Sequence, residues 1–245
     1  EAVNFPWPDP EKYIDPEECR RLVDEAPDDK VVMGMLWACH FQDTCAAFGM
    51  QTCLMNMVAE PEMVHYVDDH IVDFYLKALK IFLEATKGKV QAILIGDDVG
   101  SQRGLMISPA LISEFVIPGA KKLIDLAHSY GVKVVYHSCG SIVEAIPLLI
   151  EAGVDVIHPI QALAAGMDPA NLKDKFDGKI SFCGGVDTQD LLPNGTPEQV
   201  AAKVKELRTY FPTGLIVSPS HEGLQPDVPP SNIKALFDEA TKIYE

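Results

Sequence analysis

Short apolar runs alternate with helix-like stretches along most of the chain, and this alternation constrains the fold more than any other feature. Continuous apolar runs separated by helices are typical of a parallel sheet whose faces are covered by helices. We therefore expect an α/β fold with six strand–helix units. The predicted strands cover residues 31–36, 90–95, 132–136, 154–158, 179–182 and 215–217. Helices are expected in the stretch after the first strand up to about Gly88, from Ser108 to near Gly131, over 141–152 and, at the end of the chain, over 230–244.

The connections between the expected elements differ in length at the two ends of the sheet. Helix-to-strand turns centre on single glycines at Gly131, Gly153 and Gly178, whereas strand-to-helix loops are long, as at 96–107 and 183–195. This asymmetry is typical of a (β/α)8 TIM barrel, whose active site lies at the C-terminal ends of the strands. Because such a barrel has eight units, we expect the first two to be missing from this chain. An open doubly wound sheet is the alternative.

The domain organisation is predicted to be simple. Residues 31–245 contain no linker-like segment, so residues 1–245 are expected to form a single (β/α) barrel domain. Residues 1–30 are an acidic, proline-rich lead-in with one short helix, for which Asp15 is the expected N-cap. Pro16 suits the first turn of that helix.

Composition excludes several classes of partner. The 245 residues carry a net charge of −16, which opposes binding to nucleic acid or an anionic membrane because phosphate recognition needs clustered lysine and arginine. The six cysteines show no CxxC spacing. With no secretory signal peptide and no apolar run of about 18 residues, a cytoplasmic protein is expected.

A His-x-Cys pair ends the third predicted strand, at His137 and Cys139. Residues two apart on a strand point to the same side, and a nitrogen donor beside a thiolate suits Zn²⁺. The alternative is a buried cysteine next to a histidine that is hydrogen-bonded to the backbone.

Polar residues also follow other predicted strands. Asp97 and Asp98 could bind a cation or move a proton, or they could cap helices. A glycine pair lets the backbone approach a ligand or turn sharply. The residues expected to line a substrate pocket are Gln102, Gln161, Gly184, Gly185, Asp187 and Gln189.

A third metal ligand is expected after the last predicted strand. His221 could complete a site with His137 and Cys139, and three protein ligands with an open fourth position are typical of catalytic zinc. Glu222 could add an oxygen ligand or orient an imidazole, and Cys183 is a competing third ligand. Cys39 and His40 are more distant candidates.

At these motifs the chain resembles the uroporphyrinogen decarboxylase superfamily. Within it, the chain is most similar to the cobalamin-dependent methyltransferases, which include methylcobalamin:coenzyme M enzymes and O-demethylase components. The resemblance implies a (β/α)8 barrel and assigns the zinc pair to the His-x-Cys motif. The matching motifs are Gly-Asp97-Asp98-x-Gly-x-Gln102, His137-x-Cys139-Gly140, Gly153-Val-Asp155, Gly184-Gly185-x-Asp187-x-Gln189 and Ser-Pro-Ser-His221.

One departure from the family pattern bears on the substrate. In the coenzyme M enzymes the third ligand is a cysteine in a Ser-Pro-Gly-Cys-like segment, where this chain has Ser218-Pro-Ser-His221. Histidine can replace cysteine on zinc, and the change suits a relative with another acceptor, such as tetrahydrofolate. The true decarboxylases use no metal and hold a porphyrinogen with arginines. Only four arginines occur here, so uroporphyrinogen is not expected as the substrate.

The resemblance implies methyl transfer between methylcobalamin on a small corrinoid protein and a thiol or tetrahydrofolate-type acceptor. Zinc would hold an acceptor thiol, while Asp97 or Asp98 would manage a proton. Pairing with a second copy is also implied. One alternative is a decarboxylase-like lyase that acts on a small acid or tetrapyrrole with Asp98 as the general acid. The other is a non-catalytic binding protein of a corrinoid system.

Overall fold

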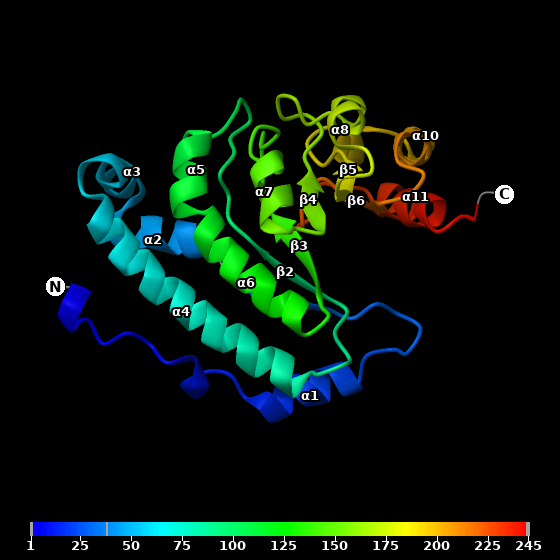
Figure 1. Ribbon diagram of the computed structural model, residues 1–245. Coiled ribbons are helices and arrows are strands. Elements are labelled where there is room, and N and C mark those ends of the chain that lie inside the picture. Colours follow the sequence, from blue (N-terminus) through cyan, green and yellow to red (C-terminus); the bar gives the residue numbers. More distant parts are fainter. Residues whose placement is uncertain (1, 38, 244–245) are drawn as a thin grey trace. The chain divides into compact units, whose positions relative to one another are not determined.

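A computed structural model describes residues 2–37 and 39–243. Their contacts divide the chain into two compact units, each assembled from several segments. The first unit takes in the residues up to 98, 107–137 and 147–155, and the second takes in 99–106, 138–146 and those from 156 onward. In both units strands alternate with helices along the chain (Figure 1).

Three parallel strands form the sheet of the first unit, in the order of the sequence. The C-terminal ends of the second and third strands are level, because Gly96 pairs with His137. Apart from their first residues, these two strands are buried, as expected for a parallel sheet between helices. The strands are β1 (Met33–Met35), β2 (Ala92–Gly96) and β3 (Lys133–His137).

Helices of the first unit are defined by caps and by apolar spacing. Asp15 Oδ1 accepts the Glu17 N–H at 2.9 Å, which confirms the predicted cap of the first helix. The longest helix, α4, begins at a proline and runs alongside α6 (Figure 1). The helices that lie wholly in this unit are α1 (Pro16–Asp24), α2 (His40–Phe48), α3 (Met50–Ala59), α4 (Pro61–Ala85), α5 (Pro109–Phe115) and α6 (Ile117–Ser129). The 3-10 turns Ala2–Asn4 and Pro10–Lys12 precede α1. Helix α7 (Ile146–Ala152) starts in the second unit and continues in the first.

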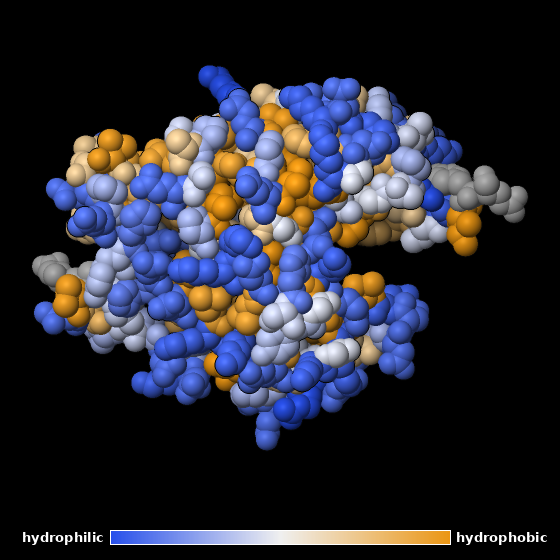
Figure 2. Space-filling model, viewed as in Figure 1, coloured by the Kyte–Doolittle hydropathy of each residue, from blue (hydrophilic) through white to orange (hydrophobic). Residues whose placement is uncertain are grey.

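One helix of the first unit leaves an apolar face in solvent. Helix α3 buries Cys53 and Met57, which are one turn apart, and exposes Met50, Met55 and Val58. Figure 2 shows apolar surface over this helix, next to hydrophilic surface. The helix therefore packs on its neighbours along a single narrow stripe.

The second unit repeats the same design with three parallel strands in sequence order. Its core is aliphatic and includes Val186, Val200, Val204 and Leu236. Helix α10 begins with a capping box, in which the side chain of Thr196 and that of Gln199 each bond the other's backbone. The elements are β4 (Val156–Ile160), α8 (Pro169–Phe176), β5 (Ser181–Val186), α9 (Leu191–Asn194), α10 (Pro197–Tyr210), β6 (Leu215–Pro219) and α11 (Pro230–Ala240).

The predicted α/β alternation is confirmed, whereas several boundaries are wrong. The strands β2 to β5 begin one or two residues further along the chain than expected, and β5 ends four residues later. Strand β6 begins at Leu215 as predicted and runs two residues further, whereas β1 is shorter than its predicted run. The helix expected between Ser108 and Gly131 is two helices, because Pro118 has no N–H to continue the first one. The stretch after Ser141 becomes helical only at Ile146.

Two further expectations concern the ends of elements. The helical stretch expected before residue 88 is three helices, and Gly49, with φ at 81°, separates the first two. The closing helix ends at Ala240, and Tyr244, where it was expected to end, lies outside the described residues. Within the described ranges, no helix is both long enough and apolar enough to cross a membrane.

Candidate functional site

The first unit places His137 at the end of β3, with Asp98 on the loop after β2. The imidazole is buried, and its Nε2 lies 3.4 Å from Asp98 Oδ1. Gly96 permits this approach, since a Cβ there would lie 2.0 Å from the His137 carbonyl oxygen. The Trp37 ring lies beside the imidazole, with 5.0 Å between ring centroids. The ends of β2 and β3 and the chain after β1 thus converge on one imidazole.

Asp97 points away from that imidazole and toward the first turn of α2. Its Oδ1 accepts the Gln42 N–H at 3.0 Å, and the Gln42 side chain in turn accepts the Asp98 N–H at 3.0 Å. Burial raises the pKa of Asp97 to about 7, although the nearby His40 opposes the rise. The two predicted catalytic acids therefore occupy different environments: Asp97 is a buried anchor, while Asp98 is partly exposed beside His137.

The second unit gathers Cys139, His221 and Glu222. One ligand atom of each lies within 4.8 Å of the other two. The His221 and Glu222 side chains are 43% and 42% exposed, and His221 Nδ1 accepts the Gly223 N–H at 3.1 Å. The predicted pairing of Cys139 with the histidine after the sixth strand is therefore present within this unit.

His137 is linked to this cluster through the chain itself. The first unit ends one of its segments at His137, and the second resumes at Ser138. Cys139 therefore follows His137 by two residues, at the passage from one unit to the other.

Hydrogen bonds hold the backbone on both sides of Cys139. The Ser138 N–H donates to the His158 carbonyl oxygen at 2.8 Å. The Gly140 N–H donates to Gln161 Oε1 at 2.7 Å. Gln161, predicted to line the substrate pocket, is buried and fixes the turn that carries the thiol. His158 is also buried.

The competing thiol ligands are buried. Burial raises the pKa of Cys183 to about 11, which disfavours the thiolate that binds metal. Burial and the nearby Asp97 also raise the pKa of Cys39. Among the residues that the structure describes, Cys183 is in no group of three metal-ligand atoms, so His221 and Glu222 are the better placed partners of Cys139.

The glycine pair at the end of β5 is required by the backbone. Gly184 and Gly185 have φ values of 117° and 95°, where glycine is favoured. A Cβ would lie 2.7 Å from the Ile160 nitrogen in the first case and 2.8 Å from a Leu207 methyl group in the second. The pair therefore permits β5 to pack closely against β4 and against Leu207 of α10.

Three further predicted pocket residues have distinct positions. Asp187 is buried and accepts backbone N–H groups from residues 189, 190 and 191, at 2.8 to 3.0 Å, which caps the start of α9. The side chains of Gln102 and Gln189 are exposed. Of the six predicted pocket residues, these two are free to turn toward a substrate.

The sequence interpretation missed Gln42, Trp37 and Asp68. Gln42 and Trp37 follow the first predicted strand, so the rule that placed the other site residues at strand ends could have found them. Asp68 lies inside a long helix, and only the folded chain brings it to His40.

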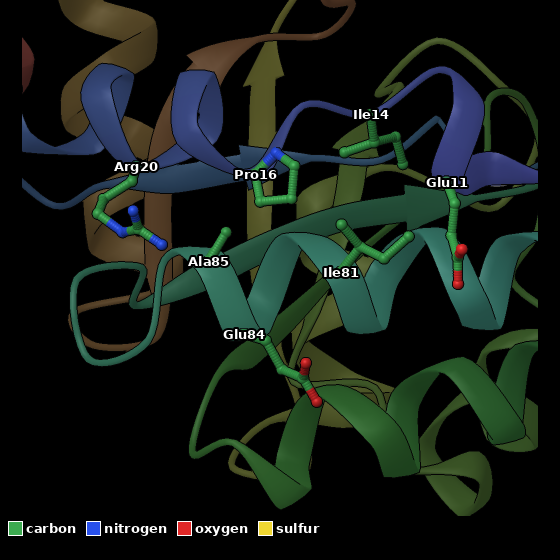
Figure 3. Close-up of a pocket in the computed structure, with 7 residues that line it drawn as sticks. All are labelled: Glu11, Ile14, Pro16, Arg20, Ile81, Glu84 and Ala85. Carbon is green, nitrogen blue, oxygen red and sulfur yellow. The ribbon is translucent and has the colours of Figure 1, made fainter.

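A separate cavity of about 490 Å³ lies in the first unit, between the lead-in and the C-terminal part of α4 (Figure 3). That end of α4 leads into the start of β2, so the cavity lies at the opposite end of the strand from Asp98. Arg20 and Glu84 flank apolar side chains such as Ile81 (Figure 3). No metal-ligand cluster of the described residues borders it, so it is distinct from the strand-end site.

Comparison with known families gives one match over most of the chain. The family profile described as uroporphyrinogen decarboxylase (URO-D) matches residues 14–243. A methyltransferase structure from Methanosarcina mazei superposes with a TM-score of 0.73 at 17% identity, covering 92% of this chain and 62% of that one. This similarity supports an α/β fold with six parallel strands, as in part of a (β/α) barrel, while the first two barrel units stay a prediction.

Curated relatives match a shorter part of the chain. A methylated-thiol–coenzyme M methyltransferase from Methanosarcina mazei is 27% identical over 150 residues, which is 60% of this chain and 36% of that protein. Methylcobamide:CoM methyltransferases from Methanosarcina mazei and Methanosarcina acetivorans are 24% and 26% identical over 152 residues. Those matches cover 62% of this chain and 42% of each relative. The chain thus aligns with less than half the length of these proteins.

Proposed function

The chain belongs to the uroporphyrinogen decarboxylase family, and on this premise we propose that it is a zinc-dependent methyltransferase. The reaction moves a methyl group between a protein-bound corrinoid and a thiol or tetrahydrofolate-type acceptor. The names of the three similar relatives, all coenzyme M methyltransferases, support this assignment. The cluster of Cys139, His221 and Glu222 carries the proposal, because it unites sulfur, nitrogen and oxygen donors.

The donor set fits zinc. His137, Cys139 and His221 offer two imidazole nitrogens and a thiolate, which suit Zn²⁺ and leave a fourth position for substrate. We assign these three as the ligands, with Glu222 as the alternative to His221. When bound there, zinc supplies Lewis acidity that lowers the pKa of an acceptor thiol, so the thiol reacts as thiolate near neutral pH.

We assign Asp98, rather than Asp97, as the acidic residue next to the reacting groups. Its position 3.4 Å from His137 Nε2 allows it to fix the orientation of the ring, as carboxylates beside metal-binding histidines do. Since Asp98 is partly exposed, it can also accept the thiol proton and pass it to water, or hydrogen-bond a pterin-type acceptor. Asp97, the other predicted catalytic acid, holds Asp98 in place indirectly. Its carboxylate accepts the Gln42 N–H, and the Gln42 side chain accepts the Asp98 N–H.

The substrate side of the site is proposed to combine adaptable and rigid residues. Gln102 and Gln189 are exposed and would contact the acceptor or the corrinoid. The rigid residues would shape the pocket through the backbone; they are Gln161, Gly184, Gly185 and Asp187. The methylcobalamin would arrive on a small corrinoid protein. Pairing with a second copy and a cytoplasmic location stay predictions.

A second candidate is a decarboxylase-like lyase acting on a small acid. One observation favours it: the family profile that matches the chain carries the decarboxylase name. In this case Asp98 would protonate the product carbanion. Turnover that depends on corrinoid separates the two functions.

Metal content tests the leading proposal. Protein purified without chelators is analysed for metals in wild type and in His137→Ala, Cys139→Ala and His221→Ala. The control is His65→Ala, at a partly exposed histidine of α4. We expect about one zinc per chain in wild type and control, and loss of zinc in the three ligand variants. Methyl transfer from methylcobalamin to a thiol should be lost with the metal. A metal-free wild type that releases CO2 from a small acid would overturn the proposal in favour of the lyase.

A further inference from the structure

His40 lies fully buried at the start of α2, and both of its ring nitrogens face oxygen atoms. Nδ1 is 2.8 Å from Asp68 Oδ1, and Nε2 is 3.1 Å from the Val116 carbonyl oxygen. Nε2 also lies 3.4 Å from Asp97 Oδ2. A neutral imidazole has a single N–H and cannot donate at both nitrogens, so this arrangement fits the doubly protonated ring.

The surroundings stabilise a positive charge on this ring. Burial alone would lower the pKa of His40, but the carboxylates of Asp97 and Asp68 outweigh it and raise the pKa to about 9. Thr44 Oγ1 donates to Asp68 Oδ1 at 3.0 Å and so holds that carboxylate toward the ring. A Cβ on Gly119 would lie 2.6 Å from His40 Cε1, so the glycine gives the ring its space.

The positive charge of His40 lies beside the Asp97 carboxylate, one oxygen of which has no hydrogen-bond donor among the described residues. Asp97 is 1% exposed, and its Oδ2 has no hydrogen bond within the described part of the chain. The other oxygen, Oδ1, accepts the Gln42 N–H of α2, and Gln42 accepts the Asp98 N–H. An ionised carboxylate accepts such bonds more strongly than a protonated one, so a nearby cation strengthens the link between α2 and Asp98.

We propose that His40 is a positioning residue, a buried imidazolium clamped by Asp68 that supplies the counter-charge for Asp97 and thereby fixes the Asp98 backbone beside His137. The effect on methyl transfer rests on the proposed function, whereas the charge and the ordering of the loop do not. The titratable groups that face the ring are Asp68 on α4 and Asp97 after β2. Three further titratable groups interact with one or both of these carboxylates; they are Cys39, Cys45 and Tyr136.

Nitrogen NMR of ¹⁵N-histidine-labelled wild type tests the charge directly, with His40→Gln used to assign the signal. An unperturbed imidazole, with a pKa of about 6.5, is neutral at pH 8. We expect both His40 nitrogens to show imidazolium shifts at that pH. A neutral His40 at pH 8 would overturn the proposal without any measurement of activity.

Amide exchange tests the positioning step. In His40→Gln, the Gln42 and Asp98 amides should exchange at least tenfold faster than in wild type, while amides of the second unit keep their rates. His65→Gln, a control on α4 near its N-terminal end, should change neither amide. If His40→Gln does not fold, Thr44→Val loosens Asp68 without removing the ring and should give the same pattern more weakly. Unchanged exchange at both amides would refute the positioning role.

Kinetics connect the role to the reaction. In an active enzyme, His40→Gln should lower kcat by about tenfold to a hundredfold with KM for the acceptor within about twofold, because Asp98 is displaced and the pocket is not. If the NMR and exchange results hold but wild type transfers no methyl group, the proposed function fails and the role of His40 stands. If kcat is unchanged in His40→Gln, Asp98 does not depend on His40 and the proposal is wrong.

Discussion

The polar cluster of the first unit around His40 and Asp97 is held by buried contacts, whereas the His221 and Glu222 side chains of the second unit are half-exposed. His40, Asp68, Asp97 and His137 are all buried, and each lies against a named polar partner. His221 and Glu222 are more than two-fifths exposed. The cluster of the first unit is therefore fixed by contacts within the protein, whereas we expect that of the second unit to be completed by the metal proposed above.

This difference separates two kinds of mutational effect. Removing the partner of a buried charge lowers the free energy of unfolding by about 3–5 kcal/mol, because the remaining charge is left in a medium of low dielectric. Removing an exposed metal-ligating side chain should change the free energy of unfolding little, since water replaces its contacts. Changes in the first unit should therefore reduce stability, and changes in the cluster of the second unit should reduce binding with little loss of stability.

The largest loss of stability is expected for Asp68→Ala. This change leaves the His40 imidazolium without its closest carboxylate, so the free energy of unfolding should fall by about 3–5 kcal/mol. The neighbouring Asp69→Ala removes an exposed pair with Lys122 and should change stability by less than about 0.5 kcal/mol. Urea denaturation measures both. Similar losses in the two variants would show that His40 carries no buried charge.

A smaller loss is expected for Gly185→Ala, which tests whether the scaffold of the second unit is rigid beneath its exposed side chains. With φ at 95°, an alanine would cost about 1–3 kcal/mol in backbone strain, in addition to its contact with Leu207. Gly104→Ala is the control, because a Cβ there meets nothing within 4 Å. If Gly185→Ala is as stable as Gly104→Ala in urea, the glycine pair is not required by the backbone and a ligand contact becomes its better explanation.

These differences also explain what the sequence could predict. The apolar runs that alternate with helical stretches predicted six strands. Because local pattern fixes where a strand ends, four site residues were then predicted at the strand ends: His137, Asp98, Cys139 and His221. Gln161 and Asp187 were found by the same rule, yet their oxygens bind backbone N–H groups. The position of a residue along a strand predicts where its Cα lies, but not which neighbouring group its side chain contacts.

The link between His40 and Asp68 was beyond the sequence for a different reason. The two residues are 28 positions apart, and their contact depends on how α4 packs against α2. Asp97 and Asp98 were indistinguishable as adjacent acids, and their opposite directions follow from the buried ring on one side and His137 on the other. Packing between helices, which has no short sequence signature, decided these roles.

The pH dependence of stability should report the buried ring. The pKa of His40 is raised from 6.5 to about 9, so the folded protein keeps a proton that the unfolded chain loses. The stabilisation is complete below about pH 6.5 and falls as pH rises. We expect a loss of about 1–2 kcal/mol between pH 6.5 and 8. Asp97, whose pKa is also raised, contributes with the same sign over the lower part of this range.

Urea denaturation at half-unit pH steps measures this slope. The window stops at pH 8, because buried thiols such as Cys183, with a raised pKa, add a loss of the same sign once free cysteine ionises near about pH 8.5. The double variant His40→Gln/Asp97→Asn removes both titrating groups and should be nearly flat over this range. A wild type that is equally stable at pH 6.5 and 8 would contradict the assignment.

The smallest effect on stability, and the clearest contrast with the first unit, is expected for Cys139→Ala. Without metal, the loss should be below about 1 kcal/mol, because the side chain is only partly buried. Zinc at a hundredfold excess over its Kd should stabilise wild type by about 2.7 kcal/mol, and the variant should gain nothing. Cys19→Ala, also at a partly buried cysteine, should keep the full gain. If metal-free Cys139→Ala loses as much stability as Asp68→Ala, the thiol is a structural residue, and the second unit does not differ from the first in this respect.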